Sequence, residues 1–139
     1  MANGAEIDAL ARLALFADIP RPQLEAIAHT FDEEIFPEGQ RVLRQGFAGS
    51  NLYVILDGEA AVVIGGTERT RLGRGEFFGD ISVLLETPPT SDIVATTSLR
   101  CLVVPGAELE RFLLGYPSVA VRMLKVMAQR LATTLEWLG

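Results

Sequence analysis

The sequence contains very little of the chemistry on which most enzymes and metal sites depend. Its 139 residues include one cysteine, Cys101, and one histidine, His29. A single cysteine excludes a disulfide within the chain and a cysteine-based zinc site, and a single histidine excludes histidine-based metal sites and most catalytic triads. We therefore expect no metal ligands, no catalytic residues and no enzymatic activity. Cys101, in the apolar stretch LRCLVV, is expected to be a small core residue.

Positive charge is also scarce. Twelve Lys and Arg stand against eighteen Asp and Glu, which gives a net charge of -6. Nucleic-acid binding needs clustered cations, so we expect none from this chain alone. No apolar run approaches the ~20 residues of a membrane span, and the N-terminus carries acids where a secretory signal has cations and an apolar run. We therefore expect no membrane segment and a cytoplasmic location.

The remaining composition is that of one globular domain, since 49% of the residues are hydrophobic. Residues 1–30 have helical spacing on either side of a pair of prolines. From 31 to 105, short runs of Val, Ile, Leu and Thr are separated by glycines, which is typical of a β sandwich or barrel. Residues 106–138 return to helical spacing. We expect the whole chain, 1–139, to form a single domain.

Two of the apolar runs predict strands that are covered on both faces. Residues 52–56 and 60–64 are apolar at nearly every position, and the Gly65-Gly66 pair that follows the second run favours a tight hairpin. A small closed barrel or jelly roll fits this pattern. The predicted strands are 31–36, 41–45, 51–56, 59–64, 68–72, 91–96 and 99–104.

The last helix is predicted to begin near Pro117-Ser118 and carries an apolar stripe at heptad spacing. Two interpretations of this stripe remain open: the helix packs on its own barrel, or it pairs with a second copy of the chain in a homodimer through residues 117–138. The stripe consists of Val121, Leu124, Ala128, Leu131, Leu135 and Leu138.

One segment, 74–95, differs from its β surroundings because a glycine-bounded turn leads into a short apolar helix and then a proline turn. The first turn of a helix presents unpaired N–H groups, so residues 79–84 could receive a phosphate. The alternative is a helical connection that only covers the mouth of the barrel.

Three stretches together resemble the cyclic nucleotide-binding domain family. They are FPEGQRVLRQGFAGSNLYVILDGEAAVV at 36–63, GRGEFFGDISVLL at 73–85, and the two C-terminal helices. The resemblance implies a mainly β fold, an eight-stranded jelly-roll barrel (a double-stranded β-helix) with flanking N-terminal and C-terminal helices. It also implies a phosphate-binding cassette, here 78–91, that holds cAMP or cGMP as a ligand, with no other cofactor.

The resemblance also assigns residues to the ligand. In the family an acid after Phe-Gly binds the ribose, and Asp80 stands here where glutamate is usual. The following backbone N–H groups face the phosphate, and the last helix covers the base, with Thr134 at the base-contacting position and Arg130 able to approach the acid. The expected ligand-binding residues are Phe78, Gly79, Asp80, Ile81, Ser82, Pro89, Thr90, Ser91, Arg130 and Thr134.

The chain departs from the family at the arginine that binds the cyclic phosphate. Pro89 or Thr90 takes its place, depending on a one-residue ambiguity in the turn, and Thr90 and Ser91 offer only hydroxyls. No Lys or Arg occurs from 75 to 99, and Asp92 is expected to repel a phosphate. A lost charge-assisted hydrogen bond costs roughly 1.5–3 kcal/mol, so cAMP is expected to bind weakly or not at all.

Two functions therefore remain open at the level of the sequence. The first is a regulatory domain that senses a cyclic nucleotide and signals through its C-terminal helix. The alternative is a fold of the same family that has lost nucleotide binding and acts as a dimerisation or protein-interaction module. The missing arginine favours the alternative.

Overall fold

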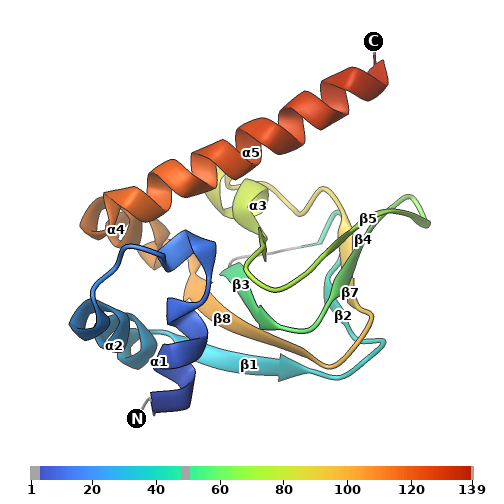
Figure 1. Cartoon of the computed structure of the whole chain (residues 1–139). Helices are drawn as coiled ribbons and strands as arrows, with labels where there is room; N and C mark the ends of the chain where they lie inside the picture. Colours follow the sequence, from blue (N-terminus) through green and yellow to red (C-terminus); the bar gives the residue numbers. More distant parts are fainter. Residues whose placement is uncertain (1–3, 48–50, 139) are drawn as a thin grey trace.

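The computed structural model describes residues 4–47 and 51–138 (Figure 1); residues 1–3, 48–50 and 139 of the predicted ranges lie outside them. Pro20 directly precedes the second N-terminal helix, and Pro22 lies in its first turn, where a missing N–H costs nothing. The predicted break between two helices is therefore confirmed. The helical segments before the strands are α1 (Gly4–Ala11), the 3-10 turn η1 (Ala14–Phe16) and α2 (Arg21–Thr30).

Eight strands form two antiparallel sheets of four. The first sheet has the spatial order β1 (Asp32–Phe36), β8 (Leu99–Pro105), β3 (Asn51–Asp57) and β6 (Phe77–Phe78). The second has the order β2 (Arg41–Leu43), β7 (Asp92–Ala95), β4 (Ala60–Ile64) and β5 (Thr67–Leu72). This order is that of a jelly roll, so the predicted eight-stranded barrel is confirmed. Only β6, with two residues, has no predicted counterpart.

The two faces of β3 contribute to two separate cores, as its unbroken apolar run predicted. Leu52, Val54 and Leu56 pack in a cluster with the helices on the outside of the first sheet. Tyr53 and Ile55 pack in the cluster between the two sheets. One sheet face therefore anchors the helices while the other closes the barrel.

The prediction that β4 is also covered on both faces is wrong for its second half. Ala60 and Ala61 are buried, but Val62 and Val63 are only partly covered and Ile64 is exposed. Val62 and Ile64 line an open cavity of the barrel instead of a closed core. In addition, the described helices lie on the side of the first sheet, and none of them covers the outside of the second (Figure 1). The hairpin prediction is confirmed, since Gly65-Gly66 joins β4 to β5 with positive φ at both residues.

Three helices complete the fold: α3 (Asp80–Leu85), α4 (Gly106–Gly115) and α5 (Pro117–Leu138). Figure 1 shows α5 running above α3 and continuing to the C-terminus. The first half of α5 contributes buried Val119 and Met123 to the core. Within the described residues, none of the helices combines the length and the apolar character needed to cross a membrane.

Cys101 should be unreactive in the folded protein. Its side chain in β8 is fully buried, and this burial, aided by the negative charge of Glu34, raises the pKa of the thiol to about 12. The thiolate fraction at pH 8 should fall roughly a thousandfold below that of an exposed cysteine, and labelling by a disulfide reagent should be slow until urea unfolds the chain. Labelling of the native protein within seconds would contradict this placement.

Candidate functional site

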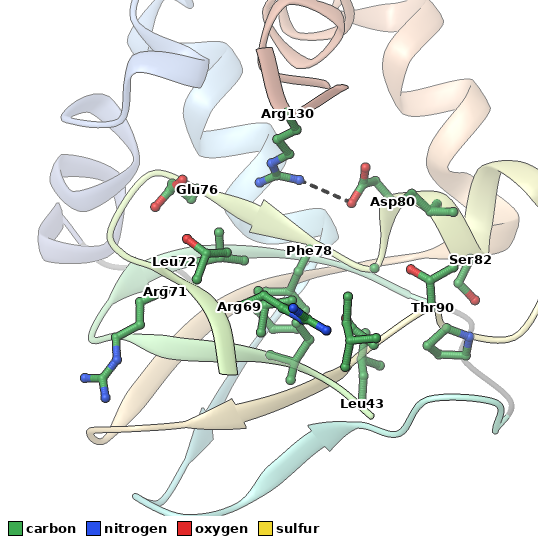
Figure 2. Close-up of a pocket in the computed structure, with 18 of the residues that line it drawn as sticks. Leu43, Arg69, Arg71, Leu72, Glu76, Phe78, Asp80, Ser82, Thr90 and Arg130 are labelled. Carbon is green, nitrogen blue, oxygen red and sulfur yellow. Dashed lines mark ion pairs between the residues drawn. The ribbon is translucent and has the colours of Figure 1, made fainter. Parts of the chain in front are cut away.

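A cavity of about 600 Å³ lies between the second sheet, the α3 segment and α5 (Figure 2). This volume is in the range of small-molecule sites, and aliphatic side chains of β2, β4 and β7 form much of the wall. The structure brings every predicted ligand-binding residue to this one cavity: Phe78, Gly79, Asp80, Ile81, Ser82, Pro89, Thr90, Ser91, Arg130 and Thr134 all line it.

Gly79 places the acid of the cassette inside the cavity. It turns the chain from β6 into α3 with φ +86, a conformation that favours glycine. A Cβ atom at this position would lie 2.3 Å from the backbone oxygen of Asn51, so any larger residue would force the strands apart. Asp80 consequently begins α3 directly behind β6, with only 4% of its surface exposed.

Arg130 links α5 to this turn through three contacts. Its Nη1 atom lies 3.6 Å from Oδ1 of Asp80, and its Nη2 atom donates a hydrogen bond of 2.7 Å to the backbone oxygen of Phe77. Its guanidinium also lies over the Phe77 ring, 4.5 Å from the ring centre. The helix and the cassette are therefore held together at the wall of the cavity (Figure 2).

Burial raises the pKa of Asp80 above the usual range of an aspartate. The positive charge of Arg130 opposes this effect, as do hydrogen bonds from the backbone N–H groups of Asp80 and Ile81. The carboxylate therefore engages N–H groups at the start of α3 that the sequence analysis assigned to a phosphate.

The hydroxyl groups at the site are partly engaged within the chain. Ser82 Oγ donates a hydrogen bond of 2.5 Å to the backbone oxygen of Thr87, and Thr134 donates one of 3.0 Å to the backbone oxygen of Arg130. Pro89 is buried, whereas Thr90 is an exposed side chain at the cavity. Of the two positions that replace the family's arginine, Thr90 is the one with room for a longer side chain.

The expected repulsion by Asp92 is not supported, because its carboxylate is turned toward β2. Oδ1 accepts a hydrogen bond of 2.7 Å from the backbone N–H of Gln45, and Oδ2 lies 3.6 Å from Nε of Arg41. Asp92 does not line the cavity, whereas its neighbour Ile93 does. The period of two along a strand was the signal that could have shown this, because it places Ser91 and Ile93 on one face and Asp92 on the other.

Part of the cavity wall lies outside the cassette and was not predicted from the sequence. Strand β5 contributes Arg69, Thr70 and Arg71, and α5 contributes Gln129 and Thr133 beside the predicted pair. The stretch from 75 to 99 contains no arginine, but the cavity that it helps to form also has arginines from β5 and α5 in its wall. Only the tertiary pairing of β5 with β4 brings the two strand arginines to the cavity.

Comparison with known proteins places this geometry in a family. Residues 33–116 match the family model of the cyclic nucleotide-binding domain. The chain is 30% identical over 127 residues to a cGMP-dependent protein kinase of Toxoplasma gondii, across 91% of this chain and 13% of the kinase. It is 27% identical over 130 residues to a CRP-like cAMP-activated global transcriptional regulator of Mycobacterium tuberculosis, across 90% of this chain and 58% of the regulator.

A solved structure agrees with these sequence matches. The catabolite activator protein of Thermus thermophilus aligns with a TM-score of 0.78 and 26% identity, over 89% of this chain and 61% of that one. The chain therefore belongs to the cyclic nucleotide-binding domain family, as its resemblance predicted. It spans 58% or less of the length of the two curated relatives.

Replacing Arg130 by glutamine should raise the pKa of Asp80 further, because the charge that opposes the effect of burial is removed. Loss of the partner of a buried carboxylate should also lower the free energy of unfolding at neutral pH by roughly 1–3 kcal/mol. This loss should shrink as the pH falls through the raised pKa, because a protonated Asp80 needs no cation. Carbon-13 NMR titration and urea unfolding at several pH values measure both effects.

The matched control is Arg122→Gln on the same helix. Arg122 pairs with exposed Asp18, with 2.5 Å between Nη1 and Oδ1, away from the cavity. Its loss should leave the pKa of Asp80 unchanged. If Arg130→Gln leaves that pKa unchanged as well, the link between α5 and the cassette is not electrostatic.

Proposed function

We propose that residues 1–139 form one regulatory ligand-sensing domain that binds a small molecule in this cavity and signals through α5. The observation that carries this proposal is that the barrel and α5 share the wall of the cavity, with Gln129, Arg130, Thr133 and Thr134 contributed by the helix. A bound ligand would touch the helix directly. The domain supplies binding and no catalysis, and we place it in the cytoplasm.

The way in which α5 is anchored supports a role in signalling. Arg130 holds the helix at the cassette, and every described side chain beyond Arg130 is exposed. The distal part of the helix is thus attached to the barrel through one cluster of contacts at the cavity. A ligand that alters the contacts of Asp80 or Arg130 would change the position of the distal helix, which is how occupancy would be transmitted.

A cyclic nucleotide is the ligand class that the family favours, because the curated relatives include a cAMP-activated regulator and a cGMP-dependent kinase. In this chain Thr90 stands at the mouth of the cavity where the family has an arginine. The cassette also uses part of its backbone donors for Asp80. We therefore propose that cAMP and cGMP bind weakly in the wild type.

The apolar stripe of α5 supports the proposal of a homodimer through residues 117–138. The alternative, that the stripe packs on its own barrel, is contradicted, since Leu124 is 64% and Leu131 59% exposed. A different face of the helix, with Val119 and Met123, packs in the cluster of helices on the outside of the first sheet. Burial of the stripe against a second copy would remove these leucines from water.

The second candidate function is a dimerisation or protein-interaction module that has lost nucleotide binding. The exposed stripe and the absence of an arginine at Thr90 are the observations that favour it. Isothermal titration with cAMP and cGMP separates the two functions, because only the sensing domain binds a ligand in the cavity.

Thr90→Arg should raise the affinity for cAMP at least about tenfold, because a guanidinium at this place restores a charge-assisted contact with the phosphate. Thr87→Arg is the control, since Thr87 is exposed in the same turn but does not line the cavity. Isothermal titration gives both affinities. Wild-type binding at a dissociation constant of about 1 μM or tighter would show that the cassette suffices without the arginine.

Leu131→Glu should convert a dimer into a monomer, because a charge would be buried in the seam of the paired helices. Glu136→Lys, an exposed change on α5 outside the stripe, should leave the dimer intact. Sedimentation velocity at ~50 μM distinguishes the two states. A monomeric wild-type protein at this concentration would rule out the homodimer.

A further inference from the structure

Three arginines line the cavity, and two of them already have partners. Arg71 pairs with Glu59, with 2.9 Å between Nη1 and Oε1, and with Glu68, with 3.2 Å between Nε and Oε2. Arg130 is engaged by Asp80 and by the backbone of Phe77. Arg69 forms no ion pair or hydrogen bond with any residue in 4–47 or 51–138. The cavity thus contains one cation whose charge is not offset by a neighbour.

A break in the pairing of β4 and β5 accounts for the position of Arg69. Val62 pairs with Thr70 and Val63 with Glu68, so Arg69 has no partner on β4 and forms the extra residue of a β-bulge. A bulge changes the direction of a side chain and is common next to functional sites. Figure 2 shows the Arg69 side chain extending across the cavity toward the side of Thr90, while Arg71 points away.

The surroundings of Arg69 restrict the ligand that can cover it. Arg69 is exposed at the wall of the cavity. A ligand that fills the cavity removes water from its guanidinium, and only an anionic group replaces the lost hydration with charge-assisted hydrogen bonds. The rest of the wall is largely aliphatic and aromatic, with Leu43, Val62, Leu72, Phe78 and Ile93. The cavity therefore combines one available cation with an apolar surface.

We propose that Arg69, on the bulge of β5, is the residue that binds the charged group of the ligand, in place of the arginine missing from the cassette. The ligand is an organic anion with a planar, apolar body, whose phosphate or carboxylate contacts Arg69 and whose body lies against the apolar wall. This inference rests on the proposed function of the cavity as a ligand site. The charged group of the ligand would then be recognised by β5 and not by the cassette.

The test is a proton–nitrogen NMR titration of the chain with two anions, cAMP and 1-naphthoate. Adenosine and 1-naphthalenemethanol are their uncharged counterparts, and the amide signals of Gly79, Thr90 and Ser91 report on the cavity. The variants are Arg69→Gln and Arg74→Gln, the second being a control at an exposed arginine that lies two residues after β5 and does not line the cavity. The two anions distinguish a phosphate from a carboxylate as the charged group.

Arg69→Gln should weaken binding of at least one anion by about tenfold or more, whereas Arg74→Gln should change it by less than about twofold. Binding of the uncharged compounds should be the same in all three proteins. Equal affinity of Arg69→Gln and the wild type for both anions overturns the inference. So does a wild type in which neither anion shifts the cavity amides at concentrations up to about 10 mM.

These outcomes are separable from a failure of the proposed function. If cAMP binds independently of Arg69, the ligand-sensing function stands and the role of Arg69 is rejected. If 1-naphthoate binds through Arg69 and cAMP does not bind, the role of Arg69 stands and a cyclic nucleotide is excluded as the ligand. If ligand binding leaves the amide signals of α5 beyond residue 131 unchanged, signalling through the helix is rejected and the Arg69 contact is unaffected.

Discussion

One arginine holds the last helix against the barrel at the place where the cavity forms. Arg130 contacts the carboxylate of Asp80, the backbone of Phe77 and the Phe77 ring, and all three depend on the sharp turn at Gly79. Asp80 is buried and needs a cation, and the cation comes from an element that is distant in sequence. The shape of the cavity and the position of α5 are therefore set by the same ion pair.

The distribution of charge around the cavity differs from what the cassette alone indicates. Asp92 forms an ion pair with Arg41 of β2. Arg71 pairs with two glutamates and Arg130 with Asp80, so most of the charged side chains around the cavity are neutralised by a partner. Of the three arginines that line the cavity, only Arg69 has no ion pair among the described residues. The cassette that resembles the family's motif thus lines the cavity, and β5, which lies outside this motif, adds Arg69 to the same cavity.

Much of the fold and the composition of the cassette could be predicted, because glycine spacing and apolar runs act locally. The jelly roll, the hairpin at Gly65-Gly66 and the segment at Gly79-Asp80 are local patterns of this kind. The exposure of Ile64 depends on the open cavity that it lines, and the direction of Arg69 depends on a bulge in the pairing of two strands. Neither property is encoded in a short stretch of sequence, so only the assembled barrel shows them.

The two faces of α5 have different surroundings along the same turns of helix. Gln129, Arg130 and Thr133 line the cavity, while Leu131 and Leu135 point into solvent. Because no side chain belongs to both sets, a substitution on one face leaves the chemistry of the other intact. In a sensing domain of the proposed kind, the preference for a ligand and the choice of a partner could therefore diverge separately, so that one scaffold acquires a new stimulus while it retains its output.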